Sequence, residues 1–218
     1  MLILNLIPKV KFLQINDGFL NEKVIDYSDF SGDDRIKLAL KKLPFSKDGV
    51  KLEINIAGDS GEDYEIIIED KILIKANDLA GAFYAIQTLR QIFKHEEIPH
   101  LYIKDKPDFK YRGFYHDVTR GRVPTVETIK SIIDNMAYYK LNSFQLYIEH
   151  AFEFKECKDI LDKFGYLTAE EIKEISIYCK QNFIDFIPSI ATFGHMFEIL
   201  QQEKYKHLRL AQECDNPN

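Results

Sequence analysis

The feature that most constrains the fold is the order of apolar runs in residues 111–150, which predicts a strand, a polar loop, a helix and a second strand in succession. The runs at 114–118 and 144–148 are short and apolar, and we interpret them as strands. Between them, apolar residues from 125 to 136 recur with the spacing of one helical face. Strand, helix and strand in this order predict parallel pairing with a right-handed crossover.

Charged residues follow each of these two predicted strands. The first strand runs into Thr119-Arg120-Gly121-Arg122, and the second runs into Glu149 and His150. In α/β folds, the carboxyl ends of the strands form the rim where binding and catalytic groups are placed. The sequence therefore predicts a functional site at the ends of these strands.

The same alternation continues in the C-terminal part of the sequence. A long connection at 151–167 indicates a functional or locally structured insert. Thr168 and Glu171 have the spacing of a capping box, which predicts the start of a helix. A third strand is predicted at 184–190, short and apolar as a buried parallel strand should be, running into Ala191-Thr192-Phe193-Gly194-His195. A further helix is predicted at 197–210.

Two architectures fit this alternation: a doubly wound sheet and a (β/α)8 TIM barrel. No glycine-rich phosphate loop follows any predicted strand, which favours the barrel. A full barrel needs about 250 residues, far more than 111–218 supply. We therefore expect about three of the eight βα units of a barrel, as the first part of a longer protein or as a truncated product. The open strand edges and uncovered inner face of an incomplete barrel predict self-association.

Residues 1–106 predict a small α/β domain and 107–218 the barrel part, with the boundary at Lys106-Pro107-Asp108, where proline interrupts the pattern. Strands are expected at the start of the chain and at 9–15, 51–57, 64–69, 72–76 and 100–103. Helices are expected at 33–43 and from Asn77 or Asp78 to Phe93. The expected domain is an antiparallel or mixed sheet with helices on one face.

Composition and charge argue against several classes of function. The net charge of −6 and the absence of a basic stripe argue against nucleic-acid binding. The first apolar run stops at Pro8 and is too short for a signal peptide or a membrane span. Three scattered cysteines, Cys157, Cys179 and Cys214, argue against a disulfide framework or a zinc cluster and indicate reduced thiols in a cytoplasmic protein.

Several motifs, taken in order, resemble the start of the catalytic barrel of family 20 glycoside hydrolases, which are mainly β-N-acetylhexosaminidases. The motifs are R-G-F-x-x-D-V-T-R at 112–120, K-L-N at 140–142, T-x-E-E-I-K-E-I from Thr168, and I-P-S-I-A-T-F-G-H at 187–195. Residues 64–93 are similar to the small α/β domain that precedes this barrel. The resemblance covers most of the chain.

The resemblance implies an exo-acting, retaining hydrolase that releases terminal N-acetylglucosamine or N-acetylgalactosamine from a glycan or glycoconjugate, without a cofactor. In that family the acetamido oxygen of the substrate attacks the anomeric carbon, an aspartate orients it, and a glutamate is the general acid. This Asp-Glu pair lies at the end of the fourth barrel strand, so the resemblance places it beyond Asn218. We therefore expect the 218 residues alone to contain no catalytic residue and to be inactive.

The resemblance also implies roles for residues at the predicted rim. Arg120 matches an arginine that binds the ring hydroxyls of the sugar, a task for which its rigid fork of donors is suited. Asp117 is expected to point into the barrel or to support Arg120. Glu149 and His150 occupy the place of an acidic cluster after the second strand, where they would bind substrate hydroxyls.

The end of the third predicted strand resembles the family less closely. His195 fits a histidine near the site, and Gly194 would let the backbone approach a ligand closely. Ser189 and Ala191 stand where a glutamate and an aspartate are common, which indicates a divergent branch.

Other interpretations stay open from the sequence. Arg120 could form only a salt bridge at the rim, Glu149 and His150 could make structural hydrogen bonds, and His195 could be a core residue. Glu149, His150 and His195 are also residue types that bind metals, although nothing fixes their geometry. No motif supports a serine or cysteine triad. The alternative from another class is a non-catalytic carbohydrate-binding or structural fragment.

Overall fold

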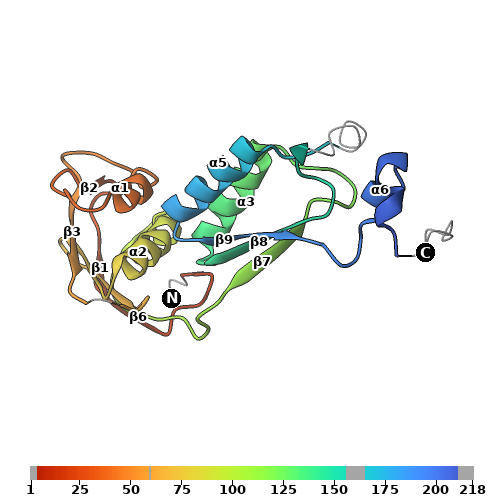
Figure 1. Ribbon diagram of the computed structural model, residues 1–218. Coiled ribbons are helices and arrows are strands. Elements are labelled where there is room, and N and C mark those ends of the chain that lie inside the picture. Colours follow the sequence, from red (N-terminus) through yellow and green to blue (C-terminus); the bar gives the residue numbers. More distant parts are fainter. Residues whose placement is uncertain (1–3, 59, 156–164, 211–218) are drawn as a thin grey trace. The chain divides into compact units, whose positions relative to one another are not determined.

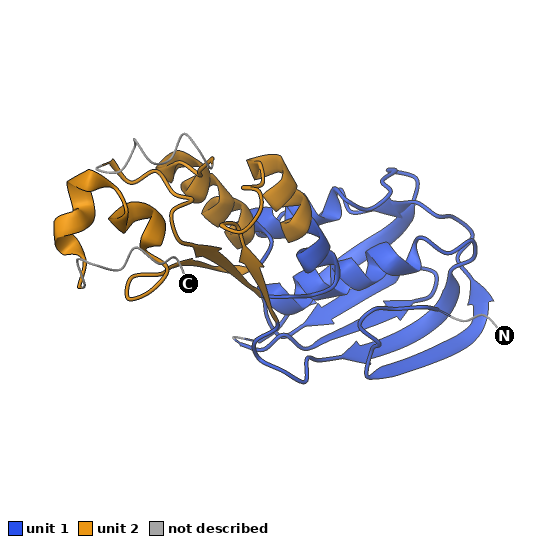
Figure 2. Ribbon diagram, turned by 90° about the vertical axis from the view of Figure 1, so that its right-hand side faces the viewer, with its two compact units in different colours: residues 1–112, 134–142, 181–183 blue, residues 113–133, 143–180, 184–218 orange. Residues whose placement is uncertain are grey.

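The computed structural model describes residues 4–58, 60–155 and 165–210, and the chain divides into two compact units (Figures 1 and 2). Unit 1 comprises residues 1–112, 134–142 and 181–183, and unit 2 comprises 113–133, 143–180 and 184–218. Each unit is built on its own sheet. Within the described part, we find no helix with the length and apolar character needed to cross a membrane.

Unit 1 is built on a six-stranded mixed sheet with the strand order β1-β6-β4-β5-β3-β2. The strands are β1 (Phe12–Phe19), β2 (Ile25–Asp26), β3 (Val50–Ile56), β4 (Tyr64–Ile68), β5 (Ile72–Ala76) and β6 (Pro99–Asp105). β3 pairs in parallel with β2 and with β5, and the other neighbours are antiparallel. The predicted mixed sheet and the predicted hairpin of β4 and β5 are therefore confirmed.

Two helices, α1 and α2, contribute to the core of unit 1. α2 (Leu79–Ile92) begins where the sequence predicts, because the carboxylate of Asp78 accepts a hydrogen bond from the backbone N–H of Gly81 at 2.8 Å. Its apolar face, which includes Phe83, Ile86 and Leu89, is buried. α1 (Asp34–Leu40) is capped by Asp33 and contacts α2. Figure 1 shows α2 lying along one face of the sheet, as the helical periodicity predicts.

The first part of the chain differs from the prediction. Residues 4–8 form no strand, and β1 starts at Phe12 instead of residue 9; residues 1–3 lie outside the described part. The side chain of Gln91 accepts a hydrogen bond from the Ile7 N–H at 2.8 Å and donates one to the Ile7 carbonyl at 2.7 Å. A buried amide thus supplies the backbone partners that a neighbouring strand would otherwise provide. Leu4, Leu6 and Val10 are therefore buried from a coil segment, whereas the Ile7 side chain is exposed.

Unit 2 contains a three-stranded parallel sheet in the order β7-β8-β9. The strands are β7 (Gly113–Asp117), β8 (Ser143–Ile148) and β9 (Asp185–Ile190). α3 (Val126–Tyr138) connects the first two strands, and α5 (Ala169–Gln181) lies between the next two in sequence. The pairing of Phe114 with Phe144, and of Phe144 with Phe186, confirms the predicted parallel alternation.

The predicted start of α5 is also confirmed. The backbone N–H of Thr168 donates to the carboxylate of Glu171 at 2.7 Å, and the N–H of Glu171 donates to the Thr168 hydroxyl at 3.2 Å. This reciprocal pair satisfies two backbone donors that the helix leaves open. Nearby, Lys130 of α3 forms an ion pair with Glu174 of α5 at 2.5 Å.

The helix predicted at 197–210 is wrong. The chain instead forms the four-residue helix α6 (Phe197–Leu200) and a 3-10 helix, η2 (Glu203–Leu208). Neither segment has a buried residue. Because helices gain most of their stability from tertiary packing, an amphipathic pattern that buries no side chain against the described part of the chain does not produce a long helix.

Part of the predicted connection at 151–167 lies outside the described residues, namely 156–164. At its two ends, Phe152 forms a parallel bridge with Leu167. The two ends of the connection are therefore paired with each other, as expected for a locally structured insert.

Two of the three cysteines, Cys157 and Cys214, also lie outside the described part. Asn218 also lies outside the described part. The expectation that the Asp-Glu pair follows Asn218 stays a prediction, because no described residue tests it. Cys179 is a free, buried thiol, and burial raises its pKa to about 12. It therefore acts as a small apolar side chain.

The two faces of the unit 2 sheet differ in exposure. Phe144, Leu146 and Ile148 of β8 are buried on one face. On the other face, Tyr115 of β7 is exposed, and Ile187 of β9 is 44% exposed. The expectation that β9 is a buried strand is therefore wrong, because in the described part of the chain β9 is an edge of the sheet.

We expect this open apolar face to cause self-association of the 218-residue chain. Ile187→Lys should lower the fraction of dimers and larger species in sedimentation velocity, because association would have to desolvate the new charge. Ile177→Lys is the matched control, since Ile177 lies on α5 and is 60% exposed. A stable monomer before any substitution, or equal effects of the two substitutions, would contradict this prediction.

Candidate functional site

The candidate site lies at the carboxyl ends of the three parallel strands of unit 2. Asp117 is the last residue of β7, Glu149 follows β8 directly, and His195 follows β9 after a short turn. The strands are in register, with Asp117 opposite Tyr147 and Tyr147 opposite Ser189. Because parallel strands end at the same edge of a sheet, these three polar side chains come together although they lie far apart in sequence.

Arg120 is the centre of this cluster. Its Nη1 is 2.5 Å from Oδ2 of Asp117, and its Nη2 is 2.8 Å from Oε1 of Glu149. The hydrogen bond to Asp117, and next the charge of Glu149, raise the pKa of the Arg120 guanidinium above its usual value. The side chain is 56% exposed, so the oriented cation is accessible to a ligand from solvent.

Asp117 is held by the turn that carries Arg120. Its Oδ1 accepts hydrogen bonds from the backbone N–H groups of Thr119 at 2.8 Å and Arg120 at 3.3 Å. Burial acts to raise the pKa of Asp117, but these hydrogen bonds and the Arg120 guanidinium outweigh it and lower the pKa. The expectation that Asp117 supports Arg120 thus agrees with its contacts in the structure.

Glu149 connects the ends of β7 and β8. Its backbone N–H donates to the Thr119 hydroxyl at 3.0 Å, and its Oε1 accepts hydrogen bonds from Arg120 and from the Tyr147 hydroxyl, the latter at 3.0 Å. The Glu149 side chain is only 9% exposed. It is therefore a fixed anion beneath the accessible face of Arg120.

Tyr147 is a site residue that the sequence analysis missed. Besides its bond to Glu149, its ring stacks on that of Tyr115, with centroids 5.7 Å apart and planes at 29°. Burial first, and then the bond to Glu149, raise the pKa of Tyr147, so its hydroxyl stays a donor. The period-two pattern of strands could have found both tyrosines, because Tyr115 precedes Asp117 by two positions and Tyr147 precedes Glu149 by two.

His195 reaches the cluster from the end of β9. Its Nδ1 lies 3.4 Å from both Nη2 of Arg120 and Oε1 of Glu149. Its backbone is left-handed, with φ of 58°, which is uncommon for a residue with a side chain. Among the described atoms, none lies within 4 Å of where a Cβ on Gly194 would be. The close approach expected at Gly194 therefore stays a prediction about a ligand.

His150, like Glu149, is buried, with 8% exposure. Its predicted contact with substrate hydroxyls stays a prediction. Within the described ranges, no group of three or more histidine, cysteine, aspartate or glutamate side chains is arranged to hold a metal ion. What the cluster offers chemically is a solvent-accessible guanidinium fixed between two carboxylates.

We expect the protonation of Asp117 to report the integrity of this cluster. A carboxylate with a lowered pKa stabilises the fold above its usual titration range, and this contribution is lost as the pH falls through the lowered pKa. In an NMR titration of the Asp117 carboxyl, Arg120→Gln should therefore raise the midpoint toward the usual aspartate value. Arg122→Gln, at an exposed neighbour, should not move it. An unchanged Asp117 midpoint in Arg120→Gln would contradict the assigned contact.

The sequence matches two family models. The model described as "Glycosyl hydrolase family 20, catalytic domain" matches residues 109–216, and the model described as "Glycosyl hydrolase family 20, domain 2" matches residues 28–106. Together they account for most of the chain. The Asp117–Arg120 turn, Glu149 and His195 all lie within the part matched by the catalytic-domain model.

Individual proteins agree with the family models. The β-hexosaminidase of Porphyromonas gingivalis is 29% identical over 199 residues, covering 78% of this chain and 25% of that protein. The N,N'-diacetylchitobiase of Vibrio harveyi is 30% identical over 186 residues, covering 69% of this chain and 21% of that protein. The chain thus spans about a quarter or less of the length of these relatives.

Solved structures show the same relationship. The GH20 exo β-N-acetylglucosaminidase from Vibrio harveyi in complex with N-acetylglucosamine has a TM-score of 0.76 at 25% identity, covering 95% of this chain and 39% of that chain. The β-N-acetylhexosaminidase from Bacteroides fragilis has a TM-score of 0.73 at 27% identity, covering 92% and 47%. From its motifs, its fold and these relatives, the chain belongs to glycoside hydrolase family 20.

Proposed function

We propose that these 218 residues form the N-terminal part of a β-N-acetylhexosaminidase that removes terminal N-acetylhexosamine from glycans. The observation that carries this proposal is the Arg120 guanidinium, fixed by Asp117 and Glu149 and open to solvent at the ends of parallel strands. A planar fork of donors suits the paired hydroxyls of a sugar ring. Family membership supports the proposal, as does the N-acetylglucosamine complex of the Vibrio harveyi enzyme.

In this proposal, residues 107–218 are the first three βα units of a (β/α)8 TIM barrel, and 1–106 are a small domain that precedes it. The support is the sequential order of β7, β8 and β9, their parallel pairing, and their polar residues at the carboxyl ends. The exposed face with Tyr115 and Ile187 would then line the barrel interior. Glu149, His150 and His195 would lie near the sugar, with Gly194 leaving space for it.

The proposed mechanism is retaining and substrate-assisted, with the acetamido oxygen of the sugar as nucleophile. It requires an Asp-Glu pair, and no Asp-Glu dipeptide occurs in the 218 residues. We therefore assign to this chain the binding of the sugar. The general acid and the carboxylate that orients the acetamido group would follow Asn218 in a longer protein. For the longer protein, the alternative of a non-catalytic carbohydrate-binding or structural role is not favoured, since the relatives are named as hexosaminidases and a diacetylchitobiase.

Arg120→Ala should weaken binding of N-acetylglucosamine to this chain by about tenfold or more, because a charge-assisted hydrogen bond to the sugar is lost. Binding can be measured by NMR titration of the Tyr115 and Tyr147 rings. Arg122→Ala is the control and should retain the original affinity. Equal affinity of Arg120→Ala and the original chain would remove Arg120 from the sugar site.

The 218-residue chain should not hydrolyse a chromogenic N-acetylhexosaminide, even at concentrations where it binds N-acetylglucosamine. The physical reason is the missing general acid, without which the leaving oxygen is not protonated. Turnover that copurifies with the chain and disappears in Arg120→Ala would show that the catalytic groups lie within these residues and not beyond Asn218.

A further inference from the structure

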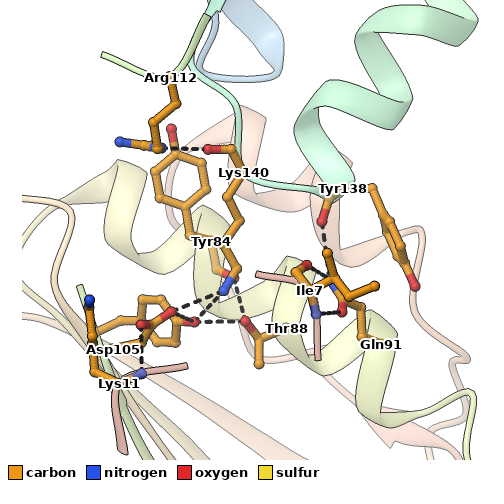
Figure 3. A network of polar contacts seen from close by, with 10 residues as sticks. Ile7, Lys11, Tyr84, Thr88, Gln91, Asp105, Arg112, Tyr138 and Lys140 are labelled. Carbon is orange, nitrogen blue, oxygen red and sulfur yellow. Dashed lines mark hydrogen bonds and ion pairs between the residues drawn. The ribbon is translucent and has the colours of Figure 1, made fainter. Parts of the chain in front are cut away.

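The most enclosed basic side chain among the described residues is Lys140, in the segment 134–142 that belongs to unit 1 (Figure 3). Its side chain is only 8% exposed. The ammonium Nζ donates to the hydroxyl of Tyr64 at 2.7 Å and lies 3.1 Å from Oδ2 of Asp105. Because lysine is almost never fully buried unless it is paired, the burial of Lys140 depends on these partners.

The partners of Lys140 form a closed network, which Figure 3 shows around the end of β6. The Tyr64 hydroxyl donates to Oδ2 of Asp105 at 2.7 Å and is 2.7 Å from the Thr88 hydroxyl. The other oxygen of Asp105 accepts from the backbone N–H of Lys11 at 3.2 Å. Burial lowers the pKa of Lys140, and the nearby Asp105 acts against this shift. The ammonium is therefore held by fixed protein groups, which water cannot easily replace at this buried position.

The backbone of Lys140 is left-handed, with φ of 62°. Its N–H bonds to the carbonyl of Ala137 and that of Leu141 bonds to the carbonyl of Met136, which together close the end of α3. This arrangement usually has glycine at the left-handed position, because a Cβ is unfavourable there. A lysine at this position makes the left-handed backbone less favourable than a glycine would, but its side chain enters the buried network.

The residues that follow the turn connect it to the start of two strands. The N–H of Asn142 donates to the carbonyl of Arg112 at 2.9 Å, and the N–H of Arg112 donates to the side-chain oxygen of Asn142 at 2.8 Å. The guanidinium of Arg112 also donates to the carbonyl of Lys140 at 2.8 Å and forms an ion pair with Glu62 at 2.7 Å. All these contacts lie within unit 1.

In the chain, Arg112 and Asn142 are followed directly by Gly113 and Ser143, the first paired residues of β7 and β8. The pairing of β7 with β8 thus begins directly after the hydrogen-bonded pair of Arg112 and Asn142, which is already fixed next to Lys140. A slip of the register by one residue would turn every later side chain of a strand to the opposite face. The carboxylates that orient Arg120 could then not meet at its guanidinium.

We propose that Lys140 is a positioning residue, whose buried ammonium holds the turn after α3 and thereby fixes the register in which β7 and β8 begin to pair. Its contribution does not depend on the proposed function, because the effect is on the backbone. The ammonium holds the turn at Lys140 in place, and the hydrogen-bonded pair of Arg112 and Asn142 lies directly after that turn.

Residue-specific hydrogen exchange by NMR on the whole 218-residue chain tests this role. Lys140→Met should speed exchange of the Arg112, Leu141 and Asn142 amides by about tenfold or more, since the interaction that orders the turn is lost. The Phe93 amide, which bonds to Leu89 in α2, reports the stability of unit 1 as a whole. Lys130→Met is the matched control on α3, with its ion pair to Glu174 at the surface.

Lys140→Met leaves the Asp105 carboxylate buried without its cation, so a general loss of stability must be separated from a local one. The double variant Lys140→Met with Asp105→Asn removes both charges; the amide oxygen can accept from the Lys11 N–H, and the amide N–H can donate to the Tyr64 hydroxyl in place of the ammonium. We expect the double variant to restore the slow hydrogen exchange of the Phe93 amide, while the Arg112 and Asn142 amides still exchange fast. Restored protection at all three amides would overturn the proposal.

Lys140→Gly gives a second, independent test, because glycine adopts the left-handed conformation without strain. If the backbone conformation alone sets the register, this variant protects Arg112 and Asn142 as well as the original chain does, and the proposal fails. We expect these amides to exchange faster in Lys140→Gly also, because the side chain is what connects the turn to Asp105 and Tyr64.

Discussion

The parallel register of β7, β8 and β9 is the constraint on which the candidate site depends. Asp117, Glu149 and His195 are separated by tens of residues, and only strands that run in the same direction bring their carboxyl ends to one edge. At this edge of the sheet, the charged side chains have different roles. Two carboxylates orient one guanidinium, and that guanidinium is the part that stays accessible. A site of this kind is defined by backbone direction first and by side-chain type second.

The chain uses ion pairs in two different environments. The pair of Lys140 with Asp105 is buried on both sides, so removing one partner leaves an uncompensated charge, at a cost of about 3–5 kcal/mol. The pair of Arg120 with Asp117 is half-exposed, and such pairs contribute little to stability because water competes for them. This difference suits two tasks. A buried pair is hard to exchange and can hold backbone in place, whereas an exposed pair can exchange a partner for the hydroxyl of a ligand.

The sequence was sufficient where a local pattern coincided with tertiary packing. The hairpin of β4 and β5, the capping box of α5 and the parallel strands followed from periodicity and caps. The sequence patterns failed at 197–210, where α6 and η2 bury no side chain in the described structure. They also failed near Ile7, where Gln91 of α2 replaces a strand partner. Arg120, Asp117, Glu149 and His195 were predicted and lie together. Tyr147 was missed although it lies two positions before Glu149, because the hydrogen bond of its hydroxyl to Glu149 becomes visible only in the folded structure.

The left-handed residues of the described chain explain a further limit of sequence patterns. A glycine normally marks the end of a helix, yet the left-handed residues that follow α3 and α5 are Lys140 and Phe183, with φ of 62° and 56°. In both cases the side chain supplies what glycine would lack. Lys140 enters the network of Asp105, and the ring of Phe183 packs 4.9 Å from that of Phe83. Strained backbone persists only where the surroundings determine it, so a lysine or phenylalanine at such a position is itself evidence of a tertiary contact. The same argument applies to His195, whose left-handed backbone lies at the candidate site, next to Arg120.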